Sequence, residues 1–586
     1  MFRAKYSDEF RSSAKQVAVI TYTNAACNEI RHRIEYDPIF AVSTIHSFAW
    51  DLIRSYSPDI RTWLKANLDK ELHELEVQQT KGRAGTKATA ERAVQIEGKK
   101  ERLERLNSIY YFTYNPNGEN VGKNSLSHAE VISISAAFLN DKPLMQQILI
   151  RKFPVLLIDE SQDTQKDLID AFFAIQKAHS THFCLSLFGD TMQRIYADGK
   201  VGLAEAVPPD WSKPAITINY RCPKRVVRLI NKVREGVDAH TQQARQDAPE
   251  GFVRLLLVQD SEALNKTAVE LEIANRMADI TSDKEWAGAS RDIKVLTLEH
   301  HMAARRGGFK EFFEPLYKVS RFRTGLLDGT LSGIPFFSQQ ILPLVTALRA
   351  GDKFATAQVV KKHSPLVAFD MLKASKSPLE DVHKADQATM ALWKLWDAGA
   401  DPILLEILKK VAADRLFSIP EPFAPILKVA ESANANVTTH QPEKDTEVNS
   451  DINAWEQALA APFSCMEAYV QYISDKSPFG THQGIKGLEF PRVMVILDDN
   501  EARGFMFNYE KLLGAEEPSP TDRKNEQEGK ETSLDRTRRL FYVTCSRARS
   551  SLAVVVYTTE IRKIAEHMHA SGWFGTDEII ELAGSQ

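Results

Sequence analysis

Two adjacent carboxylates, Asp159 and Glu160, directly follow a short apolar run in residues 155–164, which read VLLIDESQDT. A strand that delivers acidic side chains to its carboxyl end places oxygen ligands where a magnesium ion and an attacking water can be held beside a nucleoside triphosphate. The simpler interpretation is a buried strand that ends in a solvated acidic turn. The pair alone therefore suggests nucleotide chemistry without establishing it.

Four further blocks place polar residues at the ends of short apolar runs. They are residues 184–196 (CLSLFGDTMQRIY), 216–223 (ITINYRCP), 481–490 (THQGIKGLEF) and 538–549 (RRLFYVTCSRAR). Two of these blocks carry an arginine that suits phosphate contact, Arg221 and Arg547, because a planar guanidinium donates to two oxygens at once and stays charged. A lone arginine more commonly forms a surface salt bridge, so the order of the blocks carries the argument.

Together with residues 155–164, these blocks resemble, in order, motifs II to VI of the UvrD/Rep family of superfamily 1 helicases. Residues 17–30 (VAVITYTNAACNEI) and 42–48 (VSTIHSF) resemble motifs Ia and Ib of the same family. The resemblance implies an ATP-dependent DNA helicase or translocase of superfamily 1A, with 3′ to 5′ polarity and with ATP and Mg²⁺ as cofactors.

The resemblance also implies roles for individual residues. Asp159 is expected to hold the magnesium ion, directly or through water, and Glu160 to act as the base that orients the hydrolytic water. Gln193 is expected to couple hydrolysis to movement along DNA. Arg221 and Arg547 are expected to reach the γ-phosphate from a second domain.

Further contacts are implied by the same motifs. In motif V, Gly487 is expected to let the backbone approach the nucleotide closely, and Glu489 to contact the ribose. The residues expected to contact DNA are Tyr22, Asn24, His46, Tyr196 and His482. Stacking of bases on aromatic rings contributes ~1–3 kcal/mol per base and tolerates any sequence, which suits a protein that moves along DNA.

The family's glycine-rich phosphate loop, which ends in Gly-Lys-Thr, is expected well before the block at Val17, but only MFRAKYSDEFRSSAKQ precedes that residue. We expect the chain to begin inside the nucleotide-binding domain and to hydrolyse ATP weakly by itself. Two segments echo such a loop, residues 81–89 and 118–125. We interpret the first as part of a charged run and the second as a loop before a helix capped by Ser127 and Glu130.

The composition is that of an ordinary globular protein of several domains, with 586 residues, 43% hydrophobic and 26% charged. No apolar run approaches the ~20 residues of a membrane span, so we expect a cytoplasmic protein without a membrane partner. The five cysteines are scattered and show no C-x-x-C spacing, which argues against disulfides, zinc and iron–sulfur clusters. The net charge of −4 does not decide DNA binding, because a strand is held by local clusters of charge.

We expect an α/β fold with two RecA-like parallel-sheet domains, each interrupted by a largely helical insertion. The predicted parts are residues 1–50 and 125–220 (first RecA-like domain), 51–124 (insertion 1B), 221–306 and 473–586 (second RecA-like domain) and 307–472 (insertion 2B). Residues 432–451 are expected to form a loop, and the polar residues 513–533 to be disordered.

Two functions remain open on the sequence alone. The first is an active helicase, which the retained acidic and arginine residues favour. The second is a non-catalytic DNA-binding subunit that hands DNA to a nuclease partner, which the missing phosphate loop favours. Related helicases occur both in bacterial repair complexes and in two-component phage-defence systems such as Gabija, whose partner is a nuclease.

Overall fold

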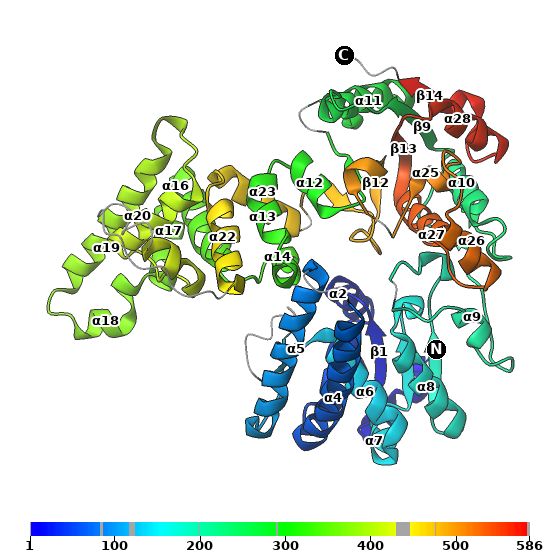
Figure 1. Cartoon of the computed structure of the whole chain (residues 1–586), viewed down its shortest axis with the longest axis horizontal. Coiled ribbons are helices and arrows are strands. Elements are labelled where there is room, and N and C mark those ends of the chain that lie inside the picture. The colour runs from blue at the N-terminus through cyan, green and yellow to red at the C-terminus, as the bar shows by residue number, and fades with distance from the viewer. Residues whose placement is uncertain are drawn as a thin grey trace. The chain divides into compact units, whose positions relative to one another are not determined.

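The computed structural model describes residues 2–82, 86–115, 124–196, 198–288, 291–428, 446–474, 476–504 and 506–582. The chain forms two compact units, residues 1–213 and 214–586 (Figure 1). The boundary between them lies a few residues before the one expected at residue 220. In the described part of the chain, no helix is both long and apolar enough to span a lipid bilayer.

The first unit is built on a parallel sheet of four strands in the order β2-β1-β5-β6. The strands are β1 (Val17–Thr21), β2 (Phe40–Thr44), β5 (Val155–Ile158) and β6 (Cys184–Leu187). Val17 pairs with Phe40 on one side and with Val155 on the other, and Val155 pairs with Cys184. Because all four strands are parallel, their carboxyl ends lie along one edge of the sheet.

Helices bury both the apolar strands and their own apolar faces in the first unit. They are α1 (Phe2–Ser12), α2 (Asn24–Arg33), α3 (Ile45–Ile53), α6 (His128–Asp141), α7 (Pro143–Lys152), α8 (Lys166–Ala178) and α9 (Leu203–Ala206). The core contains Ile20, Phe48, Leu156 and Phe172, each at most 4% exposed. Ser127 and Glu130 form the predicted capping box at the start of α6.

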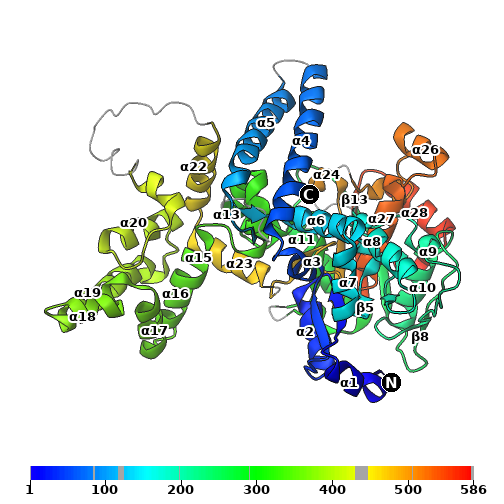
Figure 2. The same ribbon diagram turned by 90° about the horizontal axis from the view of Figure 1, so that it is seen from below.

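Two long helices, α4 (Ser57–Lys81) and α5 (Lys87–Arg105), lie side by side in the first unit (Figures 1 and 2). Residues 81–89, whose sequence partly resembles a phosphate loop, run from the end of α4 into α5. Of these, residues 83–85 lie outside the described residues. Short strands β3 (Thr113–Tyr114) and β4 (Ser125–Leu126) then lead back to α6. The second segment whose sequence partly resembles a phosphate loop, residues 118–125, lies mostly outside the described residues.

The second unit contains a parallel sheet of six strands in the order β11-β10-β12-β13-β9-β14. They are β9 (Phe252–Gln259), β10 (Lys294–Thr297), β11 (Phe479–Thr481), β12 (Phe490–Leu497), β13 (Ala548–Thr558) and β14 (Ile579–Leu582). Val493, Leu552 and Val253 lie opposite one another in adjacent strands and have no exposed surface. Such central strands, apolar on both faces, are typical of a parallel sheet covered by helices.

The helices that accompany this sheet are α10 (Lys224–Arg234), α11 (Lys266–Thr281), α12 (His300–Arg306), α24 (Asp499–Ala502), α25 (Tyr509–Leu512), α26 (Pro520–Gln527), α27 (Ser533–Cys545) and α28 (Ile561–Ala570). A separate pair of short parallel strands, β7 (Ile218–Asn219) and β8 (Gln243–Ala244), precedes it in sequence. The α/β fold class with parallel sheets is therefore as predicted.

Between residues 307 and 472, all the secondary-structure elements of the described residues are helices. The main helices are α13 (Lys310–Tyr317), α14 (Arg323–Asp328), α16 (Leu342–Arg349), α17 (Lys353–His363), α18 (Phe369–Ala374), α19 (Pro378–Trp393), α20 (Leu404–Asp414), α22 (Thr446–Leu459) and α23 (Phe463–Ile473). They share an apolar core that includes Phe312, Phe337 and Trp455. Of the loop expected at 432–451, residues 432–445 lie outside the described part, whereas the last six begin α22.

The prediction of disorder at 513–533 is wrong, because a polar network folds this segment. Helix α26 begins with a capping box of Ser519 and Asp522, and the Asp522 carboxylate also accepts hydrogen bonds from Lys511 (2.9 Å) and the Ser533 backbone (3.0 Å). Burial alone would raise the pKa of Asp522, but these donors outweigh it and hold the pKa well below its usual value. The composition correctly predicts that this segment buries few apolar side chains. The segment is nevertheless folded, because hydrogen bonds hold it.

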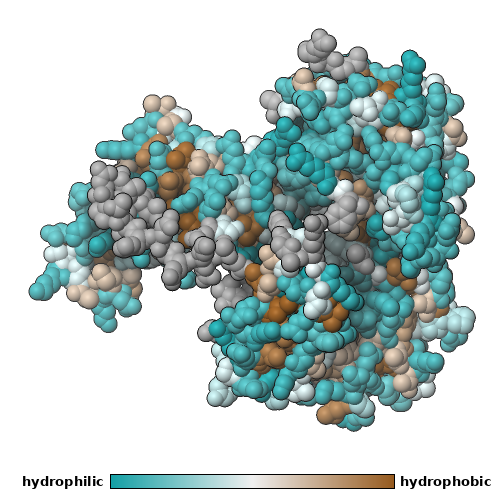
Figure 3. Space-filling view, in the orientation of Figure 1, coloured by the Kyte–Doolittle hydropathy of each residue, from teal (hydrophilic) through white to brown (hydrophobic). Residues whose placement is uncertain are grey.

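The surface is largely polar, as the composition suggests. Hydrophilic side chains cover most of the face in Figure 3, and hydrophobic ones are visible only in separate patches. Surface hydrophobicity therefore does not mark a functional site by itself, and the site has to be found from the arrangement of polar and aromatic side chains.

Candidate functional site

Asp159 lies at the carboxyl edge of the first sheet, directly after β5. Its backbone N–H donates to the carbonyl of Ile20 in the neighbouring strand β1 (2.8 Å), which extends the sheet by one residue. The hydroxyl of Thr21, the last residue of β1, donates to the Asp159 carboxylate (3.1 Å). Two strand ends therefore fix the position of this carboxylate.

Glu160 has a left-handed backbone conformation, with φ 50° and ψ 40°. This conformation is uncommon for a residue with a side chain, because its Cβ is crowded by the backbone. The Gln162 side-chain amide donates to the Glu160 carboxylate (2.6 Å). The turn and the amide together hold the second carboxylate beside the first.

Gln162 is enclosed by two glycines. It is 1% exposed, and among the described residues its side-chain carbonyl accepts no hydrogen bond. A Cβ at Gly189 would lie 2.1 Å from that carbonyl oxygen, and a Cβ at Gly199 would lie 2.2 Å from the Gln162 backbone oxygen. Only glycine fits at either position while Gln162 keeps its hold on Glu160.

Asp163 connects the acidic turn to the segment that follows β6. Its buried carboxylate accepts from the backbone N–H groups of Ile195 (3.2 Å) and Tyr196 (3.3 Å). Gln193 precedes them in a 3-10 helix of residues Thr191–Gln193, with its side chain 3.4 Å from the Asp190 carboxylate. The predicted residues Glu160, Gln193 and Tyr196 are thus parts of one hydrogen-bonded region.

Aromatic rings follow one another from this region across the first unit. Tyr196 stacks on Tyr22 with centroids 4.8 Å apart and planes at 22°, and Tyr22 meets the edge of His46 at 6.3 Å. His46 lies 4.2 Å from His128, whose ring is 5.4 Å from that of Tyr114. All five rings are half-buried, so each keeps part of its surface accessible to a ligand.

Four rings of this row, those of Tyr22, His46, Tyr114 and Tyr196, are uncharged at neutral pH. Burial, with a smaller contribution from the nearby His128, lowers the pKa of His46 to about 4. Burial likewise raises the pKa of Tyr22 and of Tyr196, with the Glu160 carboxylate adding to the effect at Tyr196. Asn24, the other residue of this unit expected to contact DNA, is exposed as the first residue of α2.

In the second unit, Arg221 and Glu489 form an ion pair. Asn219 accepts from the backbone N–H of Arg221 (2.9 Å) and so sets the turn after β7, and the Arg221 guanidinium then meets the Glu489 carboxylate at 3.0 Å. Arg549 approaches the same carboxylate at 3.5 Å. Tyr220, next to Arg221, is 69% exposed.

Arg547 lies next to this pair but is fully buried. Its guanidinium donates to the backbone carbonyls of Val543 (2.9 Å) and Leu488 (3.2 Å) and to the Ser546 hydroxyl (2.8 Å). Gly487 precedes Leu488 with φ +84°, a conformation that favours glycine. The two arginines and the 487–489 turn, far apart in sequence, therefore meet around Ser546.

His482 is the one predicted DNA contact that the structure places in a core. It has no exposed surface, and its ring nitrogens lie 3.0 Å from the Tyr509 hydroxyl and 3.2 Å from the Leu296 carbonyl. Burial lowers its pKa to about 3. In this arrangement the ring has no surface with which to touch a strand, so the expected contact is not supported at this position.

Comparisons with known proteins show which part of the chain resembles a known family. Residues 5–197 match the family model of the UvrD/REP helicase N-terminal domain. This range contains the acidic turn and the aromatic row. This part of the chain is similar to a UvrD/REP helicase N-terminal domain.

A relative of full length extends the comparison beyond this domain. The chain is 21% identical over 660 aligned positions to Gabija protein GajB of Bacillus cereus (strain HuB5-5), and the alignment covers 94% of this chain and 89% of the relative. The similarity to this relative therefore extends through both units.

The donor set at the acidic turn fits magnesium rather than a transition metal. Carboxylate and hydroxyl oxygens, as at Asp159 and Thr21, are the ligands that Mg²⁺ prefers. No cluster of three His, Cys, Asp or Glu side chains able to hold a metal occurs in the described ranges. A magnesium ion held by one or two carboxylates completes its shell with phosphate and water oxygens, so this site suits an ion that arrives with a nucleotide.

Several residues of these sites were not found from the sequence. Gln162, Gly189 and Gly199 fix the acidic turn, and His128 and Tyr114 extend the aromatic row. The only signal for Gln162 and Gly189 was their place inside the quoted blocks. His128 carried no such signal, because its contact with His46 joins residues far apart in sequence.

Proposed function

We propose that this chain is an ATP-dependent DNA translocase of 3′ to 5′ polarity that unwinds DNA. The observation that carries the proposal is the junction at Asp163. The Asp163 carboxylate accepts hydrogen bonds from the backbone N–H groups of Ile195 and Tyr196, and Asp163 belongs to the same turn as Glu160. A shift of the acidic turn is therefore transmitted to a ring that offers a stacking surface for a base.

The proposed nucleotide chemistry uses Asp159 and Glu160. Asp159, with the Thr21 hydroxyl beside it, would hold magnesium, which when bound neutralises phosphate charge. Glu160 would accept a proton from the attacking water, and Gln162 would keep its carboxylate in position. Gln193, Arg221, Gly487 and Glu489 remain the predicted nucleotide contacts for which these observations give no direct test. Arg547 has no exposed surface and donates to Val543, Leu488 and Ser546, so the proposed phosphate contact requires its guanidinium to leave these partners.

The proposed DNA-binding surface consists of Tyr22, His46 and Tyr196, continued by His128 and Tyr114. Half-buried aromatic rings in a row suit unpaired bases, because every base has a face that can stack. Asn24 is proposed to contact the backbone of the strand. We expect this surface to bind single-stranded DNA more tightly than duplex DNA, whose bases are already stacked.

We further propose that the chain works with a nuclease partner in antiviral defence. This rests on the similarity to Gabija protein GajB over 94% of the chain. A non-catalytic DNA-binding subunit of such a complex is the second candidate, and the same similarity is compatible with it. The retained Asp159, Glu160 and Thr21 arrangement favours the catalytic candidate.

Steady-state ATP hydrolysis by the purified protein, with and without oligo-dT, tests the proposal. We expect oligo-dT to stimulate hydrolysis, and the Asp159→Ala/Glu160→Ala double variant to lose it while still binding the oligonucleotide. An active double variant would refute the catalytic assignment. Oligonucleotide binding without any hydrolysis by the wild-type protein, in the presence of its nuclease partner as well, would favour the non-catalytic subunit.

A further inference from the structure

Asn219 shapes the turn that carries Arg221 in the second unit. Its side-chain oxygen accepts hydrogen bonds from the backbone N–H groups of Arg221 (2.9 Å) and Cys222 (2.8 Å). Asparagine commonly stabilises a turn in this way, by accepting from the backbone two residues later. The position of the Arg221 side chain therefore depends on the Asn219 side chain staying in place.

Gln242, just before strand β8, holds the other end of the Asn219 amide. The Asn219 NH₂ group donates to the Gln242 side-chain oxygen (2.7 Å), and the Gln242 NH₂ group donates in turn to the hydroxyl of Tyr542 (2.9 Å). Tyr542 lies in α27 and is 1% exposed. Asn219, Gln242 and Tyr542 thus form a hydrogen-bonded network that connects α27 to the Arg221 turn.

The donor and the acceptor of each hydrogen bond in this network are determined. Two backbone N–H groups point at the same atom of Asn219, so that atom is the oxygen and the other is the NH₂ group. The Gln242 atom that faces this NH₂ group must be the oxygen, which leaves the Gln242 NH₂ group to donate to Tyr542. A fully satisfied network with one arrangement resists rotation of its amides, so it holds the Asn219 side chain rigidly.

Helix α10 anchors the same network from another side. The backbone N–H of Gln242 donates to the Asn231 side-chain oxygen (3.0 Å), and the Asn231 NH₂ group donates to the Gln242 carbonyl (2.8 Å). The Tyr542 hydroxyl also accepts from Arg234 (3.4 Å), whose guanidinium donates to both oxygens of Asp238 (2.5 and 2.6 Å). Gln242 therefore has little freedom to move.

The end of α27 contacts the Arg221 turn a second time. The carbonyl of Ser546, the residue after this helix, accepts from the Cys222 thiol (3.4 Å) and lies 3.5 Å from the Arg221 guanidinium. The turn is thus attached to α27 at two points, directly at Ser546 and through Gln242.

We propose that Gln242 is a positioning residue that holds Arg221 in place for its proposed contact with the γ-phosphate. Gln242 acts through Asn219 and does not itself touch the ligand. It lies outside the sequence blocks that resemble the helicase motifs, so the resemblance assigns it no role. The inference rests on the proposed function of Arg221, but the rigidity of the turn can be measured without any nucleotide.

Three substitutions separate the parts of the network. Gln242→Met keeps the length of the side chain and removes both of its hydrogen-bonding groups. Gln242→Glu keeps an acceptor for Asn219, and its second oxygen can accept from the Tyr542 hydroxyl after that hydroxyl rotates. Tyr542→Phe keeps the buried ring and removes the group to which Gln242 donates.

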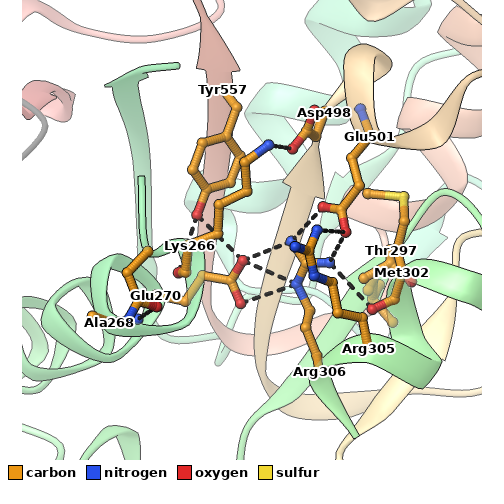
Figure 4. Close-up of polar contacts among 12 residues, drawn as sticks. Lys266, Ala268, Glu270, Thr297, Met302, Arg305, Arg306, Asp498, Glu501 and Tyr557 are labelled. Atoms are coloured by element: carbon orange, nitrogen blue, oxygen red, sulfur yellow. Dashed lines mark hydrogen bonds and ion pairs between the residues drawn. The ribbon is translucent and has the colours of Figure 1, made fainter. Parts of the chain in front are cut away.

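A different buried network of the same unit supplies a matched control. The hydroxyl of Tyr557, also 1% exposed, donates to Glu270 (3.2 Å), which pairs with Arg306 at 2.9 Å (Figure 4). These residues come from β13, α11 and α12 rather than from α10 and α27. Tyr557→Phe therefore removes an equally buried hydroxyl without removing a group that binds Gln242.

Hydrogen–deuterium exchange of the two backbone N–H groups bound by Asn219, followed by mass spectrometry, measures how firmly the turn is held. We expect exchange to be roughly tenfold faster in Gln242→Met and Tyr542→Phe than in the wild-type protein and in Tyr557→Phe.

ATP turnover in the presence of oligo-dT then tests the consequence for the reaction. In Gln242→Met and Tyr542→Phe we expect kcat to fall about fivefold and KM to change less than about twofold, because an arginine at the γ-phosphate acts mainly in the transition state. Gln242→Glu should restore both the slow exchange and the turnover.

Equal exchange in Gln242→Met and the wild-type protein would overturn the inference, as would faster exchange with an unchanged kcat. Impairment of Gln242→Glu or of Tyr557→Phe to the level of Gln242→Met would also overturn it. A wild-type protein without ATP turnover would refute the proposed function alone, and the exchange rates would still decide whether Gln242 holds the turn.

Discussion

Tyr196 stacks on Tyr22 while its backbone N–H donates to Asp163, so one residue joins a stacking ring to the acidic turn. The ring centroids are 4.8 Å apart, and the hydrogen bond is 3.3 Å long. A small shift of the acidic turn at Asp163 therefore displaces Tyr196 and, through the ring contact, affects Tyr22. The predictions below follow from this junction and from the burial around it.

Loss of the Tyr22 ring should weaken binding of single-stranded DNA. A stacked base contributes ~1–3 kcal/mol, so Tyr22→Ala is expected to lower affinity for oligo-dT by roughly 5- to 150-fold, as measured by fluorescence anisotropy. Tyr22→Phe keeps the ring and should bind like the wild type. Phe354→Ala, which removes a ring that is 73% exposed on α17, is the control. Equal affinity of Tyr22→Ala and this control would rule out the stacking surface.

Gly189→Ala should impair hydrolysis more than folding. The added methyl group would lie 2.1 Å from the Gln162 side-chain oxygen and would displace the amide that holds Glu160. We expect a loss of ~1–3 kcal/mol in stability and at least a tenfold drop in ATP turnover. Gly98→Ala, in α5 with nothing within 4 Å of the new methyl group, should instead stabilise the protein by ~1 kcal/mol.

The link between Gly189 and Gln162 can be checked by removing the clash. The double variant Gln162→Ala/Gly189→Ala should recover the stability lost in Gly189→Ala but not its turnover, because Glu160 still lacks its donor. A double variant that is no more stable than Gly189→Ala would show that the close approach to Gln162 is not what requires glycine.

Acid should destabilise the second unit through His482. Its pKa falls from 6.5 to about 3 on burial, so the unfolded chain takes up the proton first as pH drops below 6.5. The stability from the neutral ring is thus complete above pH 6.5 and decreases toward pH 3, by ~2 kcal/mol between pH 7.5 and 5. His482→Asn should show a smaller decrease in melting temperature over that interval. An equal decrease in both proteins would contradict the burial of a neutral His482.

Elements with long apolar runs bounded by turn residues could be predicted from the sequence alone. Strands β5 and β6 occur where such runs predict them, and the capping box at Ser127 and Glu130 follows directly from the residue types. The grouping of Arg221, Glu489 and Arg547 followed from the resemblance. Local pattern and motif order therefore predicted the sheets and most residues at their edges.

Side-chain direction and polar networks could not be predicted in this way. The sequence around His482 does not show whether its ring faces a ligand or the Leu296 carbonyl. Only the packing of the sheet determines the direction of the ring. Asp522 folds a polar segment through donors that are partly distant in sequence.

The ratio of ATP turnover with oligo-dT to turnover without it, compared between the wild-type protein and Asp163→Ala, tests the proposed coupling most directly. Asp163→Ala removes the acceptor for the Ile195 and Tyr196 N–H groups, whereas Asp163→Asn keeps a carbonyl oxygen there and serves as the matched control. We expect the ratio to fall to about one in Asp163→Ala and to be largely retained in Asp163→Asn, with affinity for oligo-dT still measurable in both. A ratio in Asp163→Ala equal to that of the wild type would contradict the claim that this carboxylate joins the nucleotide site to the DNA-binding surface.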